Sequence, residues 1–144
     1  MKAILNSWQL WAALSAAFAA LTAIFAKVGI ENVNSDFATF IRTIVILFVV
    51  VFLLFVTDQW QSPATIATRT YVFLALSGIA TGLSWLCYFR ALKIGEAARV
   101  APVDKLSVVL VAVFASIFLG ERLSGLHWAG VGFIATGAVI LAIK

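Results

Sequence analysis

Five apolar runs, each about twenty residues long, constrain the fold of this chain more than any motif does. They extend over residues 8–26, 37–57, 71–92, 97–119 and 123–143. An α-helix rises about 1.5 Å per residue, so about 20 residues cross the roughly 30 Å of hydrocarbon in a bilayer. Membrane spans must satisfy their backbone groups internally, and these runs lack the alternation of barrel strands. The sequence therefore predicts an all-α membrane protein, a bundle of five transmembrane helices.

Composition supports this class and excludes others. Hydrophobic residues make up 64% of the chain and charged residues 11%, which is far from the mix of a soluble domain. No Ser-, Gly- or Pro-rich linker divides residues 1–144, so we expect a single domain whose surroundings are the lipid bilayer. The net charge of +4 comes from residues scattered between the apolar runs, so no nucleic-acid surface is expected.

No enzymatic apparatus is recognisable. His127 has no ligand partner at metal-binding spacing, and no phosphate-binding Gly-Lys loop occurs, so we expect no enzyme, no cofactor and no metal site. His127 and Trp128 at a helix entrance are typical of an interfacial anchor. Cys87 has neither a His partner nor a flanking charge, which favours a buried packing role.

Small residues recur at spacing four on several of the predicted helices, and such stripes mark helix contacts in lipid. The stripes are Ala12, Ala16 and Ala20; Gly78 and Gly82; and Gly125 and Ala129. The alternative for any single pair is the ordinary abundance of small residues in membrane helices.

A polar stripe follows the third predicted helix. Its members Ser77, Thr81, Ser84 and Tyr88 recur at i, i+4, i+7 and i+11, and Trp85 flanks them. Any one hydroxyl could simply bond to a carbonyl one turn back. Four polar groups in register beside an aromatic residue are better explained as the wall of a cavity.

Ionisable residues inside spans are costly and usually face a bundle interior or water, so they are functional candidates. Arg42 lies about 7 Å into the second predicted helix, and Asp104 and Lys105 lie about 10 to 12 Å into the fourth if it starts near Ala97. Both helices enter from the same face, so these groups could pair across the bundle.

Pro102 leaves two alternatives for the fourth helix. It could be the first helical residue, where its missing N–H costs nothing and Asp104 complements the helix dipole. A helix from Pro102 to Leu119 would be only about 27 Å long, however, slightly short for the hydrocarbon. We therefore favour a helix that begins earlier and bends at Pro102.

Residues Tyr88 to Leu141 resemble the C-terminal part of the EamA domain of the drug/metabolite transporter superfamily. The resemblance is carried by "FRAL" at Phe89–Leu92, the small residues and proline within Ala97–Pro102, "LGER" at Leu119–Arg122, and a glycine-rich last helix. It covers nearly the whole chain, strongly in its second half and weakly before Ala38. It implies a gradient-driven exporter or exchanger of small metabolites, built from two five-helix repeats in opposite orientations. This chain holds one repeat.

Five spans place the N and C termini on opposite sides of the membrane, so a fused second copy would be inverted. A lone copy must find its partner by association, most simply as a homodimer, which could be antiparallel. The N-terminal side carries Lys2, Arg69 and Arg122, whereas the other side carries Lys27, Arg90, Lys93, Arg99 and Lys144. The positive-inside rule thus favours a cytoplasmic C terminus, and the bias weighs against a dual topology without excluding it.

The sequence therefore predicts a multi-pass protein of the cell membrane that acts as a secondary active transporter of small metabolites or drugs, working as a dimer. Asp104 is the expected proton-titrating or ion-pairing group, with Arg42 and Lys105 as its partners or as contacts for an anionic part of the small-molecule substrate. Trp85 and Tyr88 would form the aromatic wall of the cavity, and Ser77, Thr81 and Ser84 its polar face.

Two alternatives stay open. A four-helix multidrug exporter would need an acidic residue in its first helix, and residues 8–26 contain none. The other alternative is a non-transporting membrane subunit or a component of a lipid-carrier flippase, in which the polar residues bind helices to a partner.

Overall fold

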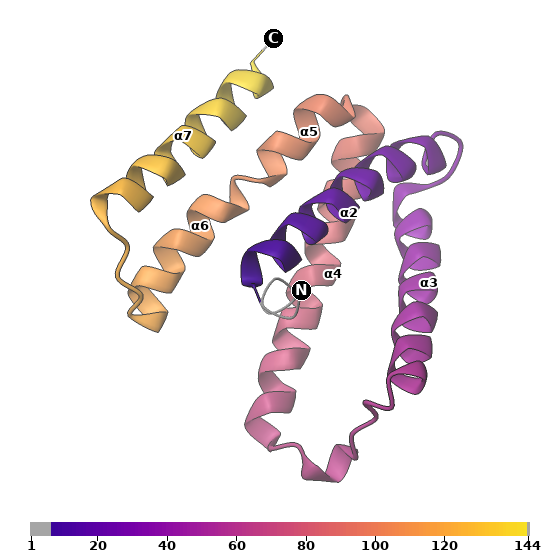
Figure 1. Ribbon diagram of the computed structural model, residues 1–144. Helices are drawn as coiled ribbons and strands as arrows, with labels where there is room; N and C mark the ends of the chain where they lie inside the picture. Colours follow the sequence, from indigo (N-terminus) through magenta and orange to yellow (C-terminus); the bar gives the residue numbers. More distant parts are fainter. Residues whose placement is uncertain (1–6, 144) are drawn as a thin grey trace. The chain divides into compact units, whose positions relative to one another are not determined.

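The computed structural model describes residues 7–143 and confirms the predicted class (Figure 1). Its elements are α2 (Trp8–Gly29), α3 (Ser35–Val56), η1 (Pro63–Thr65), α4 (Thr68–Ile94), α5 (Ala97–Asp104), α6 (Ser107–Phe114), η2 (Ala115–Leu119) and α7 (Gly125–Ala142). The described residues contain five helical spans long and apolar enough to cross a membrane, and no strand. Lys2 and Lys144, which entered the charge count, lie outside the described residues.

Local capping explains where two of the spans begin. Asn34 accepts hydrogen bonds at its side-chain oxygen from the amides of Asp36 (2.9 Å) and Phe37 (3.2 Å), so α3 starts at Ser35, two residues before the predicted boundary. Ser124 accepts from the amide of His127, and the His127 ring accepts from the amide of Ser124, which starts α7 at Gly125. His127 therefore has a defined role as a capping residue.

The fourth span begins at Ala97, as favoured, and Pro102 lies inside α5. The helix is not continuous, however: it is interrupted at Lys105 and Leu106, three residues beyond the predicted bend. There the amide of Leu106 donates to Val103 and the amide of Val108 to Lys105, each at 3.0 Å and each three residues back instead of four. Such a tightened turn within a helix often marks a functional hinge.

A π-helical turn, η2, ends this span. Gly120 follows it with a φ of 68°, the left-handed conformation that glycine adopts without steric cost. The glycine of the "LGER" motif therefore stops the fourth span.

The described residues form two compact units, which we treat separately. The first combines the segment up to Lys27 with the segment from Ile94 onward. In it α7 lies alongside α5 and α6 (Figure 1), and the Lys27 ammonium donates a 2.8 Å hydrogen bond to the carbonyl of Gly95. The chain entering α5 is thus tied to the end of α2.

The second unit, Val28–Lys93, contains α3, η1 and most of α4. Its buried side chains are Ile30, Thr39, Phe89 and Leu92, and Leu92 is completely buried. All four lie in the loop before α3, in the first turns of α3 or in the last turns of α4. The core of this unit therefore sits at one end of the α3–α4 pair.

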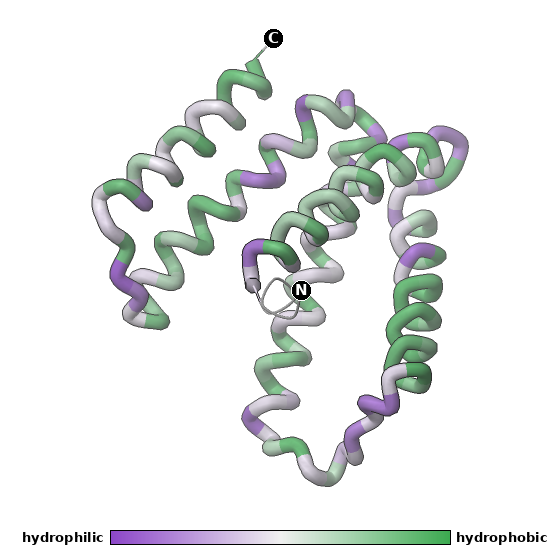
Figure 2. The backbone as a smooth tube through the Cα atoms, in the orientation of Figure 1, coloured by the Kyte–Doolittle hydropathy of each residue, from purple (hydrophilic) through white to green (hydrophobic). Residues whose placement is uncertain are grey.

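Most apolar side chains of the spans face outward. Figure 2 shows continuous hydrophobic colour along the second half of α3, with hydrophilic segments in its first turns, at the connections and at the junction of α5 and α6. The bulky run Ile44–Val56 consists largely of exposed aliphatic and aromatic residues. An apolar surface of this kind suits hydrocarbon and not water.

Two expectations about packing are corrected. Cys87, expected to be buried, is exposed. The small-residue stripes do not mark helix contacts within their own units: Ala12, Ala16 and Ala20 are exposed, and a Cβ added at Gly78 or Gly82 would meet no atom within 4 Å. Small residues permit the close approach of two helices but do not by themselves cause it.

Candidate functional site

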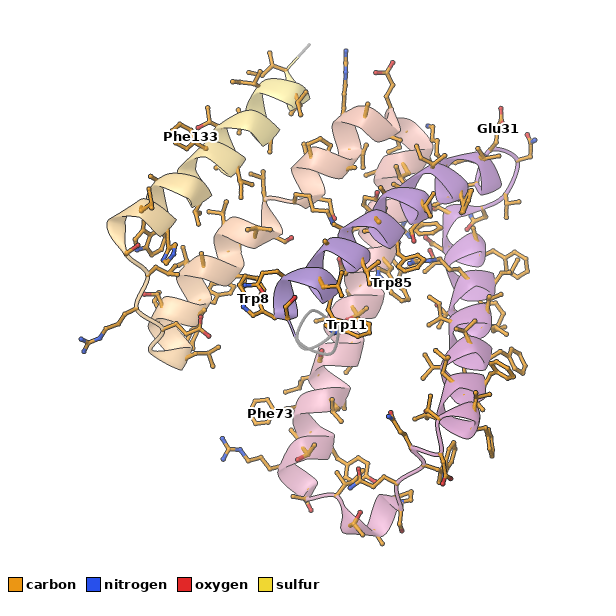
Figure 3. All side chains as sticks on the ribbon, in the orientation of Figure 1. Trp8, Trp11, Glu31, Phe73, Trp85 and Phe133 are labelled. Atoms are coloured by element: carbon orange, nitrogen blue, oxygen red, sulfur yellow. The ribbon has the colours of Figure 1, made fainter. Side chains whose placement is uncertain are left out.

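Arg42 and Trp85 are brought together from α3 and α4. The guanidinium carbon of Arg42 lies 4.2 Å from the centre of the Trp85 ring and 5.3 Å from that of Phe89. Figure 3 shows Trp85 on the side of α4 that faces α3. Arg42 is half-buried, and it lies seven residues into α3, at a depth of about 10 Å. A cation over the face of an aromatic ring is attracted by the ring's quadrupole, so these contacts hold the guanidinium in place.

An ion pair joins α3 and α4 next to this contact. The Arg90 guanidinium donates to both carboxylate oxygens of Asp36, at 2.6 and 3.1 Å. Asp36 is oriented for this bond by its place in the first turn of α3, beside the Asn34 cap. Bidentate geometry makes this the best-directed ion pair in the unit, although both side chains remain substantially exposed.

Lys93, one turn beyond Arg90, fixes the loop that leads into α3. Its ammonium donates to the carbonyls of Ile30 (2.6 Å), Glu31 (2.9 Å) and Val33 (2.9 Å). An ammonium has three protons, and each finds a carbonyl here. The start of α3 and the end of α4 are therefore joined by charged hydrogen bonds.

In the first unit the predicted pair of Asp104 and Lys105 is formed. The Lys105 ammonium lies 3.2 Å from a carboxylate oxygen of Asp104, at the interruption between α5 and α6. Asp104 lies seven residues from the start of the Ala97–Leu119 span, about 10 Å along its axis. Figure 2 shows this junction as a hydrophilic segment within an apolar span.

The predicted stripe on α4 has an ordinary local bond at its centre. Thr81 donates its hydroxyl to the carbonyl of Ser77 at 2.9 Å, one turn back, which is the alternative weighed for any single hydroxyl. Ser77 and Ser84 are exposed, and Tyr88 is partly buried with its ring against Phe89. No cavity wall follows from these contacts, so the lining role of the stripe stays a prediction.

The site residues are divided between the two units. Arg42, Trp85, Tyr88 and the hydroxyl stripe belong to Val28–Lys93, whereas Asp104 and Lys105 belong to the other unit. The pairing of Arg42 with Asp104 therefore stays a prediction. Among residues 7–143, no three His, Cys, Asp or Glu side chains come together as a group that could hold a metal ion.

Sequence reasoning missed Asp36, Phe89 and Lys93. A signal for them existed: Arg90 and Lys93 are three residues apart and so share one face at the end of a helix. Because α3 and α4 are antiparallel neighbours, the end of α4 lies at the level of the start of α3, where Asp36 is found. The carbonyl acceptors of Lys93 could not be recognised in the sequence, because every loop residue has a backbone carbonyl.

These features define a class: a multi-pass α-helical membrane protein with ionisable side chains inside its spans. The chain belongs to the EamA-like transporter family, which matches residues 6–143.

Two sets of relatives accompany this match. A protein of Sinorhizobium sp. named "Uncharacterized transporter in cobO 3'region" is 65% identical over 138 residues, which cover 96% of this chain and 98% of that protein. Proteins named "Probable 4-amino-4-deoxy-L-arabinose-phosphoundecaprenol flippase subunit ArnE", from Yersinia pestis (strain Pestoides F) and Yersinia pseudotuberculosis serotype O:1b (strain IP 31758), are each 30% identical over 84 residues, 58% of this chain and 74% of theirs. No solved structure matches the chain.

Proposed function

We propose that this protein is a secondary active transporter that moves small metabolites or drugs across the cytoplasmic membrane. One observation carries the proposal: the candidate membrane span Ala97–Leu119 is interrupted along its length, and the interruption holds the Asp104–Lys105 pair. Transporters commonly build their substrate and ion sites at discontinuous helices, where irregular backbone lines a polar path. Membership of a transporter family supports the same conclusion.

Asp104 is the proposed coupling group. A carboxylate held against an ammonium is neutralised as a pair, which lowers the cost of keeping both inside a span. Protonation of Asp104 would remove its charge and release Lys105 for an anionic part of a substrate. The two residues would thereby couple proton movement to substrate binding.

The residues of the α3–α4 unit supply the remaining proposed contacts. Arg42 would bind an anionic group of the substrate or pair with Asp104. Trp85 and Tyr88 would form an aromatic wall, and Ser77, Thr81 and Ser84 a polar face. The contact between Arg42 and Trp85 supports this assignment, because it holds a charged side chain beside an aromatic one within the spans.

The proposed working unit is a dimer of five-helix chains, with a homodimer as the simplest form. Its support is the odd number of spans among residues 7–143, together with small-residue faces that remain open within each unit. Small residues at helix surfaces are typical of close contacts in lipid.

The experiment is uptake of a metabolite and drug panel into proteoliposomes under an imposed pH gradient. We expect gradient-driven transport by the wild type and its loss in Asp104→Asn, because an amide keeps the size of the side chain but cannot bind the coupled proton. Folding of the variant is checked by its elution as a single species with wild-type thermal stability. Unchanged uptake by a folded Asp104→Asn variant would discard Asp104 as the coupling group.

A second candidate is a membrane subunit of a lipid-carrier flippase that does not transport alone. The relatives named as a flippase subunit favour it. In that case the protein should co-purify with a second membrane protein, and the pure chain in liposomes should transport none of the panel.

A further inference from the structure

Arg42 is distinguished from the other three cations of Val28–Lys93 because it is half-buried and yet has no hydrogen-bond acceptor among the described residues. Val28–Lys93 contains four Lys or Arg residues. Arg90 is bonded to Asp36, Lys93 to three carbonyls, and Arg69 lies exposed over Phe73 at the start of α4. Within the described residues, the Arg42 guanidinium forms no hydrogen bond and no ion pair.

Stacking on a ring does not use the donors of a guanidinium. Its five N–H groups lie in the plane of the group, whereas Trp85 and Phe89 contact it through their π systems. The two rings therefore attract the charge of Arg42 without supplying a hydrogen-bond acceptor, and no such acceptor is present among the described residues. A guanidinium presents two parallel N–H donors, here called its planar fork. This fork matches two oxygens of one carboxylate or phosphate better than a mobile ammonium does.

An anionic acceptor would offset the cost of placing the Arg42 guanidinium inside an apolar span. It is half-buried about 10 Å inside the α3 span, and the residues that follow it, Ile44–Val56, are apolar. A cation in such surroundings is partly desolvated, and its neighbour Asp36 is already bound by Arg90. No carboxylate of Val28–Lys93 is paired with Arg42, so an anionic group from outside the α3–α4 unit could provide the compensating charge.

We propose that Arg42, held against the rings of Trp85 and Phe89, is a binding site for an anionic oxygen group, a phosphate or a carboxylate. This inference rests on the proposed transport function and deepens it, because it makes an anionic group part of the substrate. Phe89 and Trp85 are positioning residues that hold the fork, and the apolar surface beyond Arg42 accepts a hydrophobic part attached to the anion.

The test is isothermal titration of the full-length protein in phosphatidylcholine nanodiscs. The probes are inorganic phosphate, hexyl phosphate and, with reversed charge, hexyltrimethylammonium. We expect hexyl phosphate to bind and hexyltrimethylammonium not to bind. Arg42→Gln should weaken hexyl phosphate binding by about ten- to a hundredfold, the effect of losing charge-assisted hydrogen bonds. Equal binding of the cationic probe, or unchanged binding by Arg42→Gln, would overturn the proposal.

Two further variants keep the result interpretable. Arg69→Gln is the matched control, because Arg69 is also a cation beside an aromatic ring but is exposed at the other end of α4; its binding should be unchanged. Arg42→Lys keeps the charge without the planar fork and should bind more weakly than wild type. If Arg42→Gln does not fold, wild-type affinity in Arg42→Lys would overturn the stacked-fork geometry.

The source of the anion is separated by a second set of nanodiscs that contain phosphatidylglycerol. Competition with hexyl phosphate that is absent in Arg42→Gln identifies a lipid headgroup, whereas unchanged binding identifies a soluble anion; both support the site. Binding is measured without a gradient, so it is independent of transport. Arg42-dependent binding without any uptake would support the anion site and reject the transport function. Uptake without Arg42-dependent binding would reject the anion site alone.

Discussion

The cations at one end of the α3–α4 pair have different tasks because their acceptors differ. Arg90 meets a carboxylate, Lys93 meets three carbonyls, and Arg42 meets two aromatic rings. A carboxylate and loop carbonyls are parts of the fold, so Arg90 and Lys93 contribute to the attachment of α3 to α4. Aromatic faces leave donors available, so Arg42 is suited to bind something else. Residue type alone would not separate the three.

Lys93 should contribute measurably to stability. Lys93→Met keeps most of the aliphatic stem but removes the ammonium, so the carbonyls of Ile30, Glu31 and Val33 lose their donor. We expect a loss of about 1 to 2 kcal/mol in the free energy of unfolding, measured by denaturant titration in detergent micelles. Arg122→Met, at an exposed cation in the loop before α7, is the control and should change little. A Lys93→Met variant as stable as this control would contradict a structural role.

At the scale of the elements, helix termini and interruptions are set by a few local bonds. Asn34 begins α3, the Ser124–His127 pair begins α7, and Gly120 ends η2. The interruption between α5 and α6 is the exception, because it falls at Lys105 and Leu106 although Pro102 lies inside α5. The Asp104–Lys105 ion pair lies at this interruption, so charged side chains and irregular backbone occur together within an otherwise apolar span.

The Asn34 cap should contribute to the free energy of unfolding although Asn34 lies in an exposed loop. Asn34→Ala removes the acceptor for two amides in the first turn of α3 and loosens the turn that presents Asp36 to Arg90. We expect a loss of about 1 kcal/mol in the free energy of unfolding, the usual cost of an N-cap. The matched variant Asn32→Ala changes an exposed asparagine in the same loop, which forms no hydrogen bond within residues 7–143. Equal stability of the two variants would show that the cap does not matter.

Much of the fold was predictable because hydrocarbon thickness dictates helix length. The five spans and the early start of the fourth follow from apolar run lengths alone. The site was predictable only in part. Arg42, Asp104 and Lys105 stand out as charges in apolar runs, but the contact of Arg42 with Phe89 and the carbonyl acceptors of Lys93 depend on tertiary packing. Small-residue spacing predicted contacts that do not form within the units, since spacing shows where helices can approach and not whether they do.

At the scale of the whole molecule, the five candidate spans of the described residues and the distribution of charge bear on assembly. Several cations counted toward a cytoplasmic C terminus also serve the fold: Lys27 binds the Gly95 carbonyl, Arg90 binds Asp36 and Arg99 lies 3.2 Å from Glu96. Asp and Glu contribute little to orientation, so these bonds leave the bias in the count of Lys and Arg unchanged. The charge bias still favours one orientation, so the antiparallel homodimer, which requires insertion in both orientations, is a proposal that a labelling experiment can decide.

Orientation can be measured with a cysteine added after Lys144 in a Cys87→Ser background, because Cys87 is exposed and would also react. If the protein works as an antiparallel homodimer, a membrane-impermeant maleimide should label part of the population from each side of the membrane.

Extra lysines near the C terminus should then fix one orientation and abolish transport, and co-expression with a chain fixed in the opposite orientation should restore it. The control is the same pair of chains carrying Asp104→Asn, which should assemble without transporting. Labelling from one side only, with full transport, would contradict the antiparallel homodimer and favour a parallel pair or a second protein as the partner.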